Sequence, residues 1–396
     1  MPLIGLPAEV RRTLTLSDTS QVGLHPSVIP DNGTAIDFET MPSAVLAFPI
    51  TRRSVFELSY TPRFTLFDAF ATTEQQWLQL HTGTLSYSYS TRRFHFTLAQ
   101  SGSYGTQNFS SLTYTAPPST NPGAPPDPTI PQVNPVPAST TISILSEQTS
   151  ASFSINWTRR WMSTVFGSYG ISGGRNVDSQ TLLPQTKTTV AGAILDYTLS
   201  RRDRLATTAS VVFSNTSNGF EHRVVQAAEV WSHNFNRILS GSLGLGVIHD
   251  NTTAPQGVET NETSPTVSAG LTGNLVRRKR FQVALTLGAT YGLVLNPFSG
   301  ELQKRFQWLS LLSVRQNKTT LAVTLDGAQT FPTDEPGSIS VVGLGFVLTQ
   351  ELSKLVSVSG GYRKIWQTTI LPTGGTLPEQ WFAFAGVSIH PPPIKL

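Results

Sequence analysis

The chain has 396 residues, a formal net charge of +4, no cysteine, 13% charged residues and 38% hydrophobic residues. Soluble proteins carry about 25% charged residues, yet no apolar run here approaches the roughly 20 residues of a membrane-spanning helix. Without cysteine, a disulfide framework and a thiolate metal site are both excluded. The small positive excess is spread over turns rather than gathered in one patch, so we expect no nucleic-acid partner.

In chain order, the first recurring feature is a basic turn. Copies that begin at residues 11, 51 and 91 are spaced 40 residues apart. Later copies are Thr158-Arg159-Arg160, Ser200–Asp203, Asn236-Arg237, Arg277–Arg280, Gln316–Lys318 and Ser353-Lys354. A period of about 40 residues indicates a repeat architecture.

Each period contains two long segments in which apolar and small polar residues alternate. In the clearest segment, 281–295, every odd position is apolar, whereas the even positions from 282 to 292 are Gln, Ala, Thr, Gly, Thr and Gly. Segments 55–66, 191–199 and 239–247 repeat the pattern. Successive side chains of a strand point to opposite faces, so each segment predicts a strand with one apolar face. A soluble sheet would bury that face against a core, whereas a membrane barrel would turn it toward lipid.

Two kinds of connection alternate between these strands. The basic turns are short, and the others are longer and rich in Pro, Asn, Thr and Gly, as in 25–33 and 250–264. Tight turns at one end and long loops at the other are typical of an outer-membrane barrel. Eight internal basic turns and nine long loops predict an all-β, antiparallel, up-and-down transmembrane barrel of about 18 strands. An even strand number places both termini on the short-turn side, which we expect to be periplasmic.

We expect the barrel to span residues 11–390, between a periplasmic segment 1–10 and a periplasmic tail 391–396. The opening residues show no signal-peptide pattern. One loop, 105–141, is unusually long and extracellular. Its central part, Ala116–Pro137, contains nine prolines, which cannot donate hydrogen bonds to a sheet, so it is extended and unpaired. It could be a mobile surface loop, or a lid or plug folded into the pore.

Aromatic residues lie near the predicted strand ends, as in the interfacial girdles of membrane barrels. The predicted girdle is Trp77, Trp157, Trp161, Trp308, Trp366 and Trp381, with Trp231 and Phe281 placed similarly. Trp157 and Trp161 bracket one basic turn and would anchor that hairpin at the headgroups. Ordinary packing of large side chains is the alternative.

Parity also assigns ionisable side chains to the face opposite the lipid. The predicted lumen-facing residues are Glu57, Arg63, Asp196, Glu221, Arg223, Glu229, His233, Arg305, Asp326 and Arg363. An 18-stranded barrel is wide enough for a water-filled lumen, and ionisable groups at membrane depth are tolerated where water reaches them. Both signs occur, which predicts weak ion preference. The strand 221–235 concentrates charge and aromatic rings, so it is a candidate for solute contact, with ion pairing across strands as the alternative.

Soluble and enzymatic alternatives fit less well. A β-propeller also repeats at about 40 residues, but its blades need four short strands. The sequence has no G-x-S-x-G, H-E-x-x-H or phosphate-loop motif, and its seven histidines lack metal-ligand spacing. We therefore expect neither catalysis, a metal nor a cofactor, although residues distant in sequence could form a hydrolase site at the rim.

Long strands joined by Thr-Arg-Arg turns over the whole chain resemble the outer-membrane β-barrel porin families of Gram-negative bacteria, and most closely the barrels found alongside exopolysaccharide export systems. The final strand, Gln380–His390, is similar to the closing strand of such proteins but continues into a Pro-rich tail from Pro391. The resemblance implies an outer-membrane location, contact with lipid and lipopolysaccharide, and export of a polysaccharide with periplasmic partners. A general diffusion porin for small hydrophilic solutes and a structural or adhesive barrel with a blocked lumen remain alternatives.

Overall fold

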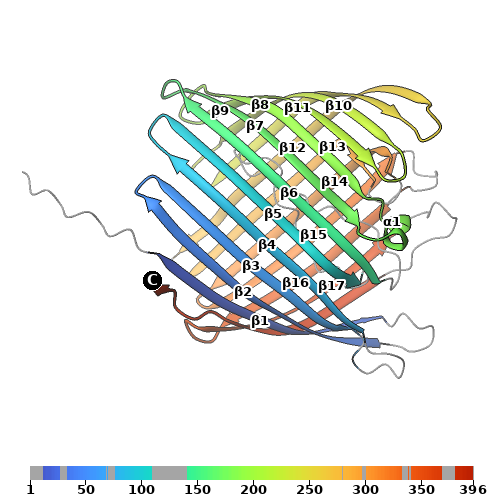
Figure 1. Cartoon of the computed structure of the whole chain (residues 1–396). Coiled ribbons are helices and arrows are strands. Elements are labelled where there is room, and N and C mark those ends of the chain that lie inside the picture. Colours follow the sequence, from blue (N-terminus) through green and yellow to red (C-terminus); the bar gives the residue numbers. More distant parts are fainter. Residues whose placement is uncertain are drawn as a thin grey trace, which may run out of the picture.

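The computed structural model is a single antiparallel sheet that closes on itself (Figure 1). The structure describes residues 12–26, 34–67, 69, 76–108, 141–278, 280–296, 300–331, 338, 340–367 and 380–395. Each long strand pairs with the next along the chain, and β1 pairs with β18 through seven residue pairs from Asp18–Ile389 to Leu24–Ala383. The predicted barrel of about 18 strands is therefore confirmed.

The strands are long and of similar length. Their bounds are β1 Thr13–Pro26, β2 Thr34–Thr51, β3 Ser54–Phe67, β4 Gln76–Ser90, β5 Phe94–Asn108, β6 Thr141–Asn156, β7 Trp161–Gly174, β8 Thr186–Thr198, β9 Asp203–Thr216, β10 Glu221–Asn234, β11 Leu239–Thr253, β12 Glu259–Arg278, β13 Phe281–Leu295, β14 Leu302–Gln316, β15 Thr319–Phe331, β16 Ser340–Glu351, β17 Val356–Gln367 and β18 Gln380–Ile389. A two-residue strand, β19 Ile394–Lys395, continues the edge of β18 by pairing with the start of β1. The expected tail 391–396 thus includes residues that extend the sheet.

The two ends of the barrel differ in their connections. Eight turns of two to four residues lie at one end, and nine connections, all but one of them longer, lie at the other. Figure 1 shows the C-terminus beside the start of β1, at the end that carries the short turns. One longer connection contains the only helix of the described residues, α1 Val177–Leu182, whose N-cap Asn176 accepts a hydrogen bond from the Ser179 amide. The segment 1–10 and most of the 105–141 loop (109–140) lie outside the described residues, and the periplasmic position of the short-turn end stays a prediction.

The short turns share a hydrogen-bonding device that explains their recurring first residue. Thr158 Oγ1 accepts hydrogen bonds from the backbone amides of Arg160 and Trp161, both at 3.1 Å. Thr91, Ser200, Asn236 and Ser353 do the same in their own turns. A side-chain oxygen that satisfies two turn amides favours Thr, Ser or Asn at that position. The following arginines are left free to point into solvent.

The two faces of the sheet differ in exposure because the barrel is curved. Side chains diverge on the convex face and converge on the concave face, so outward residues are the more exposed ones. On β11, for example, Leu243, Leu245 and Val247 are exposed at 45%, 57% and 45%. Register carries this parity around the barrel, since paired residues share a face: Leu245 pairs with Val267, and Val267 with Tyr291 of β13. The odd positions of 281–295 therefore face outward.

The outward face also carries a few polar residues. Gln100 and Glu147 share it with Leu98 and Phe153, and Gln100 Nε2 donates to Glu147 Oε1 at 3.0 Å. Thr40 Oγ1 donates to Asp18 Oδ1 at 3.1 Å next to the β1–β18 seam. Each carboxylate is thus hydrogen-bonded to a neighbouring strand. No helix in the described part of the chain combines the length and apolarity needed to cross a membrane.

Candidate functional site: the barrel lumen

The lumen is lined mainly by small and hydroxyl-bearing side chains. On β11 and β12 the inward positions include Ser240, Ser242, Gly244, Ser268 and Thr272. A sheet of 18 strands encloses a lumen wider than its own side chains can fill. Hydroxyl groups that line such a lumen exchange hydrogen bonds with water or with other hydroxyl-rich solutes.

The best-defined inward ion pair joins two strands that are not neighbours. Asp326 on β15 and Arg363 on β17 approach to 2.8 Å, although β16 runs between them. Gly343 is the β16 residue beneath the pair, and a Cβ built there would lie 2.8 Å from Arg363 Nη2 and 3.2 Å from the Asp326 carboxylate. The absence of a side chain at Gly343 therefore leaves room for the bridge.

Two further inward ion pairs join adjacent strands. Arg204 on β9 contacts Asp196 on β8 at 2.7 Å. Arg63 on β3 is hydrogen-bonded to Glu39 on β2, which also accepts from Gln21 Nε2 of β1 at 3.1 Å. Sequence reasoning missed the partners Glu39 and Arg204, although Arg204 precedes the outward Leu205 and so has the parity of Asp196.

Part of the lumen wall near the loop end is covered rather than open. Arg305, Asp326 and Thr330 on β14 and β15 have exposures of 1%, 0% and 1%. All three guanidinium nitrogens of Arg305 are buried without a hydrogen-bond partner. The lumen is thus narrower here than the strand number alone implies.

The structure places the ten predicted lumen residues on both faces. Arg63, Asp196, Arg305, Asp326 and Arg363 lie on the inward face described above, and Glu57 shares the parity of Arg63 on β3. Their part in transport stays a prediction.

The expectation that four residues of β10 line the lumen is wrong. Glu221, Arg223, Glu229 and His233 pair with outward residues of β9 and β11; Glu229, for example, pairs with Leu245. Both parities of β10 contain polar side chains, so alternation within this strand cannot decide its face, and the register with its neighbours does. Instead, His233 Nδ1 contacts Asp203 at 2.7 Å and lies beside Trp231 on the outer surface. Solute contact by these four side chains inside the lumen is therefore excluded.

The predicted girdle residues divide between the two barrel ends, with one exception. Trp157, Trp161 and Trp231 lie at the short-turn end, and the Trp161 ring packs 4.3 Å from that of Tyr197. Trp77, Trp366 and Trp381 lie at the loop ends of their strands. Trp308 instead lies in the middle of β14 and covers Gly327, whose Cβ would fall 2.7 Å from the indole. The prediction that Trp308 belongs to the girdle is therefore wrong. Its ring instead fills the space above Gly327 on the outer surface.

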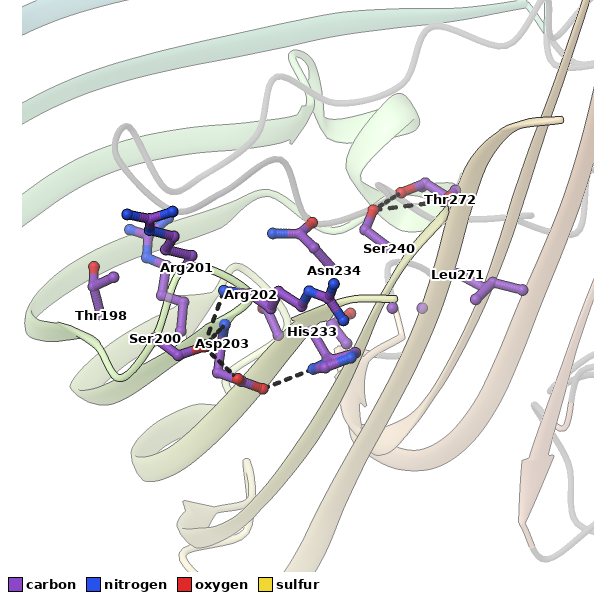
Figure 2. A pocket seen from close by; sticks show the side chains of 15 residues that line it. Thr198, Ser200, Arg201, Arg202, Asp203, His233, Asn234, Ser240, Leu271 and Thr272 are labelled. Carbon is purple, nitrogen blue, oxygen red and sulfur yellow. Dashed lines mark hydrogen bonds and ion pairs between the residues drawn. The ribbon is translucent and has the colours of Figure 1, made fainter. Parts of the chain in front are cut away.

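A cleft of about 470 Å³ opens at the short-turn end of β8 to β12. Figure 2 shows Arg201 and Arg202 of the β8–β9 turn beside Asn234 and Ser240 in this cleft. Its inward lining residues are Thr198, Arg204, Ser232, Asn234, Ser240, Ser242, Gly270 and Thr272, and the outward residues Asp203, His233, Gly241 and Leu271 complete its edge. Ser240 and Thr272 hydrogen-bond to each other at 2.9 Å. Small polar residues on every second position of adjacent strands were the available sequence signal for this cleft.

The inward side chains of these sites offer hydroxyl groups and arginine–carboxylate pairs as possible contacts for a polar solute. Across the described residues, no three His, Cys, Asp or Glu side chains come together as a metal site. The inward carboxylates Glu39, Asp196 and Asp326 each have an arginine partner. A closed barrel with an apolar outer face and a mainly polar inner wall defines the class of outer-membrane channels.

Comparisons with solved structures show the same barrel fold. The FrpB iron transporter from Neisseria meningitidis superimposes with a TM-score of 0.53 at 7% identity, covering 94% of this chain and 66% of FrpB. OccK2 from Pseudomonas aeruginosa superimposes with a TM-score of 0.50 at 10% identity, covering 97% of this chain and 98% of OccK2. At such low identities the similarity concerns the fold, and this chain spans just under two thirds of FrpB. No curated protein sequence matches the chain.

A sequence model of the EpsX exopolysaccharide export family matches residues 28–305, well over half of the chain. The chain belongs to the EpsX exopolysaccharide export family, and its barrel is located in the bacterial outer membrane.

Proposed function

We propose that this barrel exports a polysaccharide, which enters at the short-turn end from the periplasm and leaves at the loop end. Periplasmic export proteins would deliver the polymer to the short-turn end. The observation that carries the proposal is the family match over residues 28–305, most of the sheet from β2 to β14. The same strands provide the inward Ser, Thr and Gly positions that form the lumen wall.

The chemistry of the lumen supports a hydroxyl-rich cargo. A polymer that binds the lumen wall strongly would not leave the channel. The wall of an exporter should therefore offer many weak hydrogen bonds rather than a few strong ones. Inward serines and threonines such as Ser242 and Thr272 provide such bonds. The charges of Asp196 and Asp326 are neutralised by Arg204 and Arg363, which prevents them from repelling or trapping a polymer.

Genetic complementation in the native host tests this function. Deletion of the gene should abolish surface polysaccharide, and the unaltered chain should restore it. A Ser242→Trp variant, which places a large ring on the inward face, should restore it poorly. The matched variant Leu243→Trp adds the same ring to the outward face and should restore it fully. Unchanged surface polysaccharide after deletion would refute the export proposal.

Single-channel conductance separates export from general diffusion. A closed barrel that opens when residues 116–137 are deleted supports a gated exporter; this segment lies outside the described residues. A large, steady open state of the intact chain favours a diffusion porin. Absence of conductance even after the deletion favours a structural or adhesive barrel with a blocked lumen.

A further inference from the structure

The fold gathers the recurring basic turns, which are dispersed along the sequence, at one end of the barrel. We call their exposed side chains the basic rim: Arg52, Arg53, Arg92, Arg93, Arg159, Arg160, Arg201, Arg202, Arg237, Arg278, Arg280, Lys318 and Lys354. Two acidic residues, Asp203 and Glu351, lie at the strand ends joined by these turns, and each already has a partner, His233 and Arg315 respectively. The rim therefore has a large excess of positive charge.

The opposite end has no such excess. Among the described residues of the long connections and the three strand residues on either side of them, the acids are Asp178, Glu221, Glu259 and Glu301, and they are balanced by the bases Arg175, Lys187, Arg223 and Lys304. A net charge of +4 for the chain hides this asymmetry. Positive charge concentrated at one mouth of a channel attracts an anion to that mouth.

The cleft at the rim connects this charge to the lumen. Arg201 and Arg202 line it together with the inward residues Ser240, Ser242 and Thr272 (Figure 2). Its volume of about 470 Å³ falls within the roughly 300–1,000 Å³ of small-molecule sites. Guanidinium groups recognise carboxylates through paired hydrogen bonds, and the neighbouring hydroxyls suit sugar hydroxyls.

We propose that the basic rim and this cleft bind an acidic, carboxylate-bearing polysaccharide as it enters the lumen. This inference rests on the proposed export function and specifies its substrate class. Phospholipid headgroups are the competing anions at this level of the membrane. Headgroups contact the outward face, however, where β10 and β11 present Trp231 and Leu243, whereas the cleft's hydroxyls are on the inward face. A ligand that touches Arg202 and Ser242 together therefore lies in the lumen mouth.

Block of the channel in planar bilayers tests the proposal. The full chain is used, in the 116–137 deletion background if the intact barrel is closed. The probe is oligogalacturonate, and dextran of equal length is the neutral control. Because the chain has no cysteine, biotin on a single Lys354→Cys substitution reports which side carries the short turns. We expect oligogalacturonate to block from that side, with an on-rate that falls as salt rises.

Variants locate the site. The double variant Arg201→Gln/Arg202→Gln should lower the blocking on-rate by about threefold to tenfold, a fraction of the 10- to 10³-fold that electrostatic steering supplies. Arg175→Gln, at the loop end, is the matched control and should leave the rate unchanged. An unchanged rate in the double variant overturns the proposal. So does a double variant that blocks normally but binds phosphatidylglycerol vesicles less well, which would make the rim a headgroup anchor.

The neutral control, dextran, distinguishes a failure of the acidic-substrate inference from a failure of the proposed export function. Equal block by dextran and oligogalacturonate leaves polysaccharide passage standing and refutes the acidic preference. No block by either polymer, together with normal surface polysaccharide in the deletion strain, refutes both.

Discussion

Arg363 Nη2 and Asp326 Oδ2 lie 2.8 Å apart across an intervening strand. Asp326 is fully buried, whereas the Arg363 side chain is 22% exposed. This pair joins β15 to β17 inside the barrel and stiffens the wall beside the covered part of the lumen.

Removal of the arginine should destabilise the barrel substantially. Arg363→Met leaves the Asp326 carboxylate buried without its counter-charge, which costs about 3–5 kcal/mol. The matched control is Arg315→Met, whose pair with Glu351 is about half exposed and contributes less than about 1 kcal/mol. Urea unfolding in lipid vesicles measures both. Equal losses in the two variants would show that the bridge contributes no more than a surface pair.

Addition of one methyl group beneath the pair should also be harmful. Gly343→Ala places a Cβ 2.8 Å from Arg363 Nη2 and 3.2 Å from the Asp326 carboxylate. The guanidinium must then shift away from its buried partner, and we expect this to cost about 1–3 kcal/mol. Gly345→Ala, on the same face, meets Arg363 at an ordinary 3.5 Å and should be tolerated. In an Arg363→Met background the Gly343→Ala penalty should shrink. A penalty that persists there would locate the strain elsewhere.

The capped turns predict a smaller effect. Thr158→Ala removes the acceptor of two backbone amides, and we expect a loss of about 0.5–2 kcal/mol, as for helix N-caps, which use the same geometry. Thr158→Ser keeps the oxygen and should retain most of the stability. Comparison of the free energies of unfolding decides this, and similar losses in the two variants would assign the effect to the Thr methyl group.

The two faces of β13 predict opposite responses to a charge. Leu287→Arg places a cation on the outward face, which costs about 2–4 kcal/mol near the bilayer midplane. The neighbouring Thr286→Arg points inward and should alter ion selectivity with little loss of stability. Unfolding measurements report the change in stability of each variant, and reversal-potential measurements report the change in ion selectivity. A reversed order of stability would mean that the faces are exchanged.

The strand number and the face of β13 were predictable because alternation there is nearly perfect from Phe281 to Leu295. The face of β10 was not, since Glu221, Arg223 and Glu229 share their parity with Val225 and Trp231, and polar residues occupy the other parity too. Register with Leu245 settles it. Parity within one strand is a local signal, whereas the face of a mixed strand is set by its neighbours.

Two other features, the Asp326–Arg363 bridge and the basic rim, could not be predicted because they depend on which distant residues lie close together in the fold. The Asp326–Arg363 bridge needs a glycine on a third strand. The basic rim forms because eight turns that are 36 to 67 residues apart in the sequence meet at one end of the barrel. Each turn alone reads as an exposed pair of arginines. The prediction that the positive charge is spread over the protein was therefore wrong, because the fold brings the turns together at one end of the barrel.

The central claim, that hydrocarbon covers the outward face, is tested most directly by spin labels on single cysteines along β13. The native chain has no cysteine, so each label reports one position from 281 to 295 in reconstituted vesicles. If hydrocarbon covers this face, odd positions are accessible to oxygen dissolved in lipid and protected from an aqueous nickel chelate. Odd positions shielded from both reagents, as in a protein interior, would contradict it.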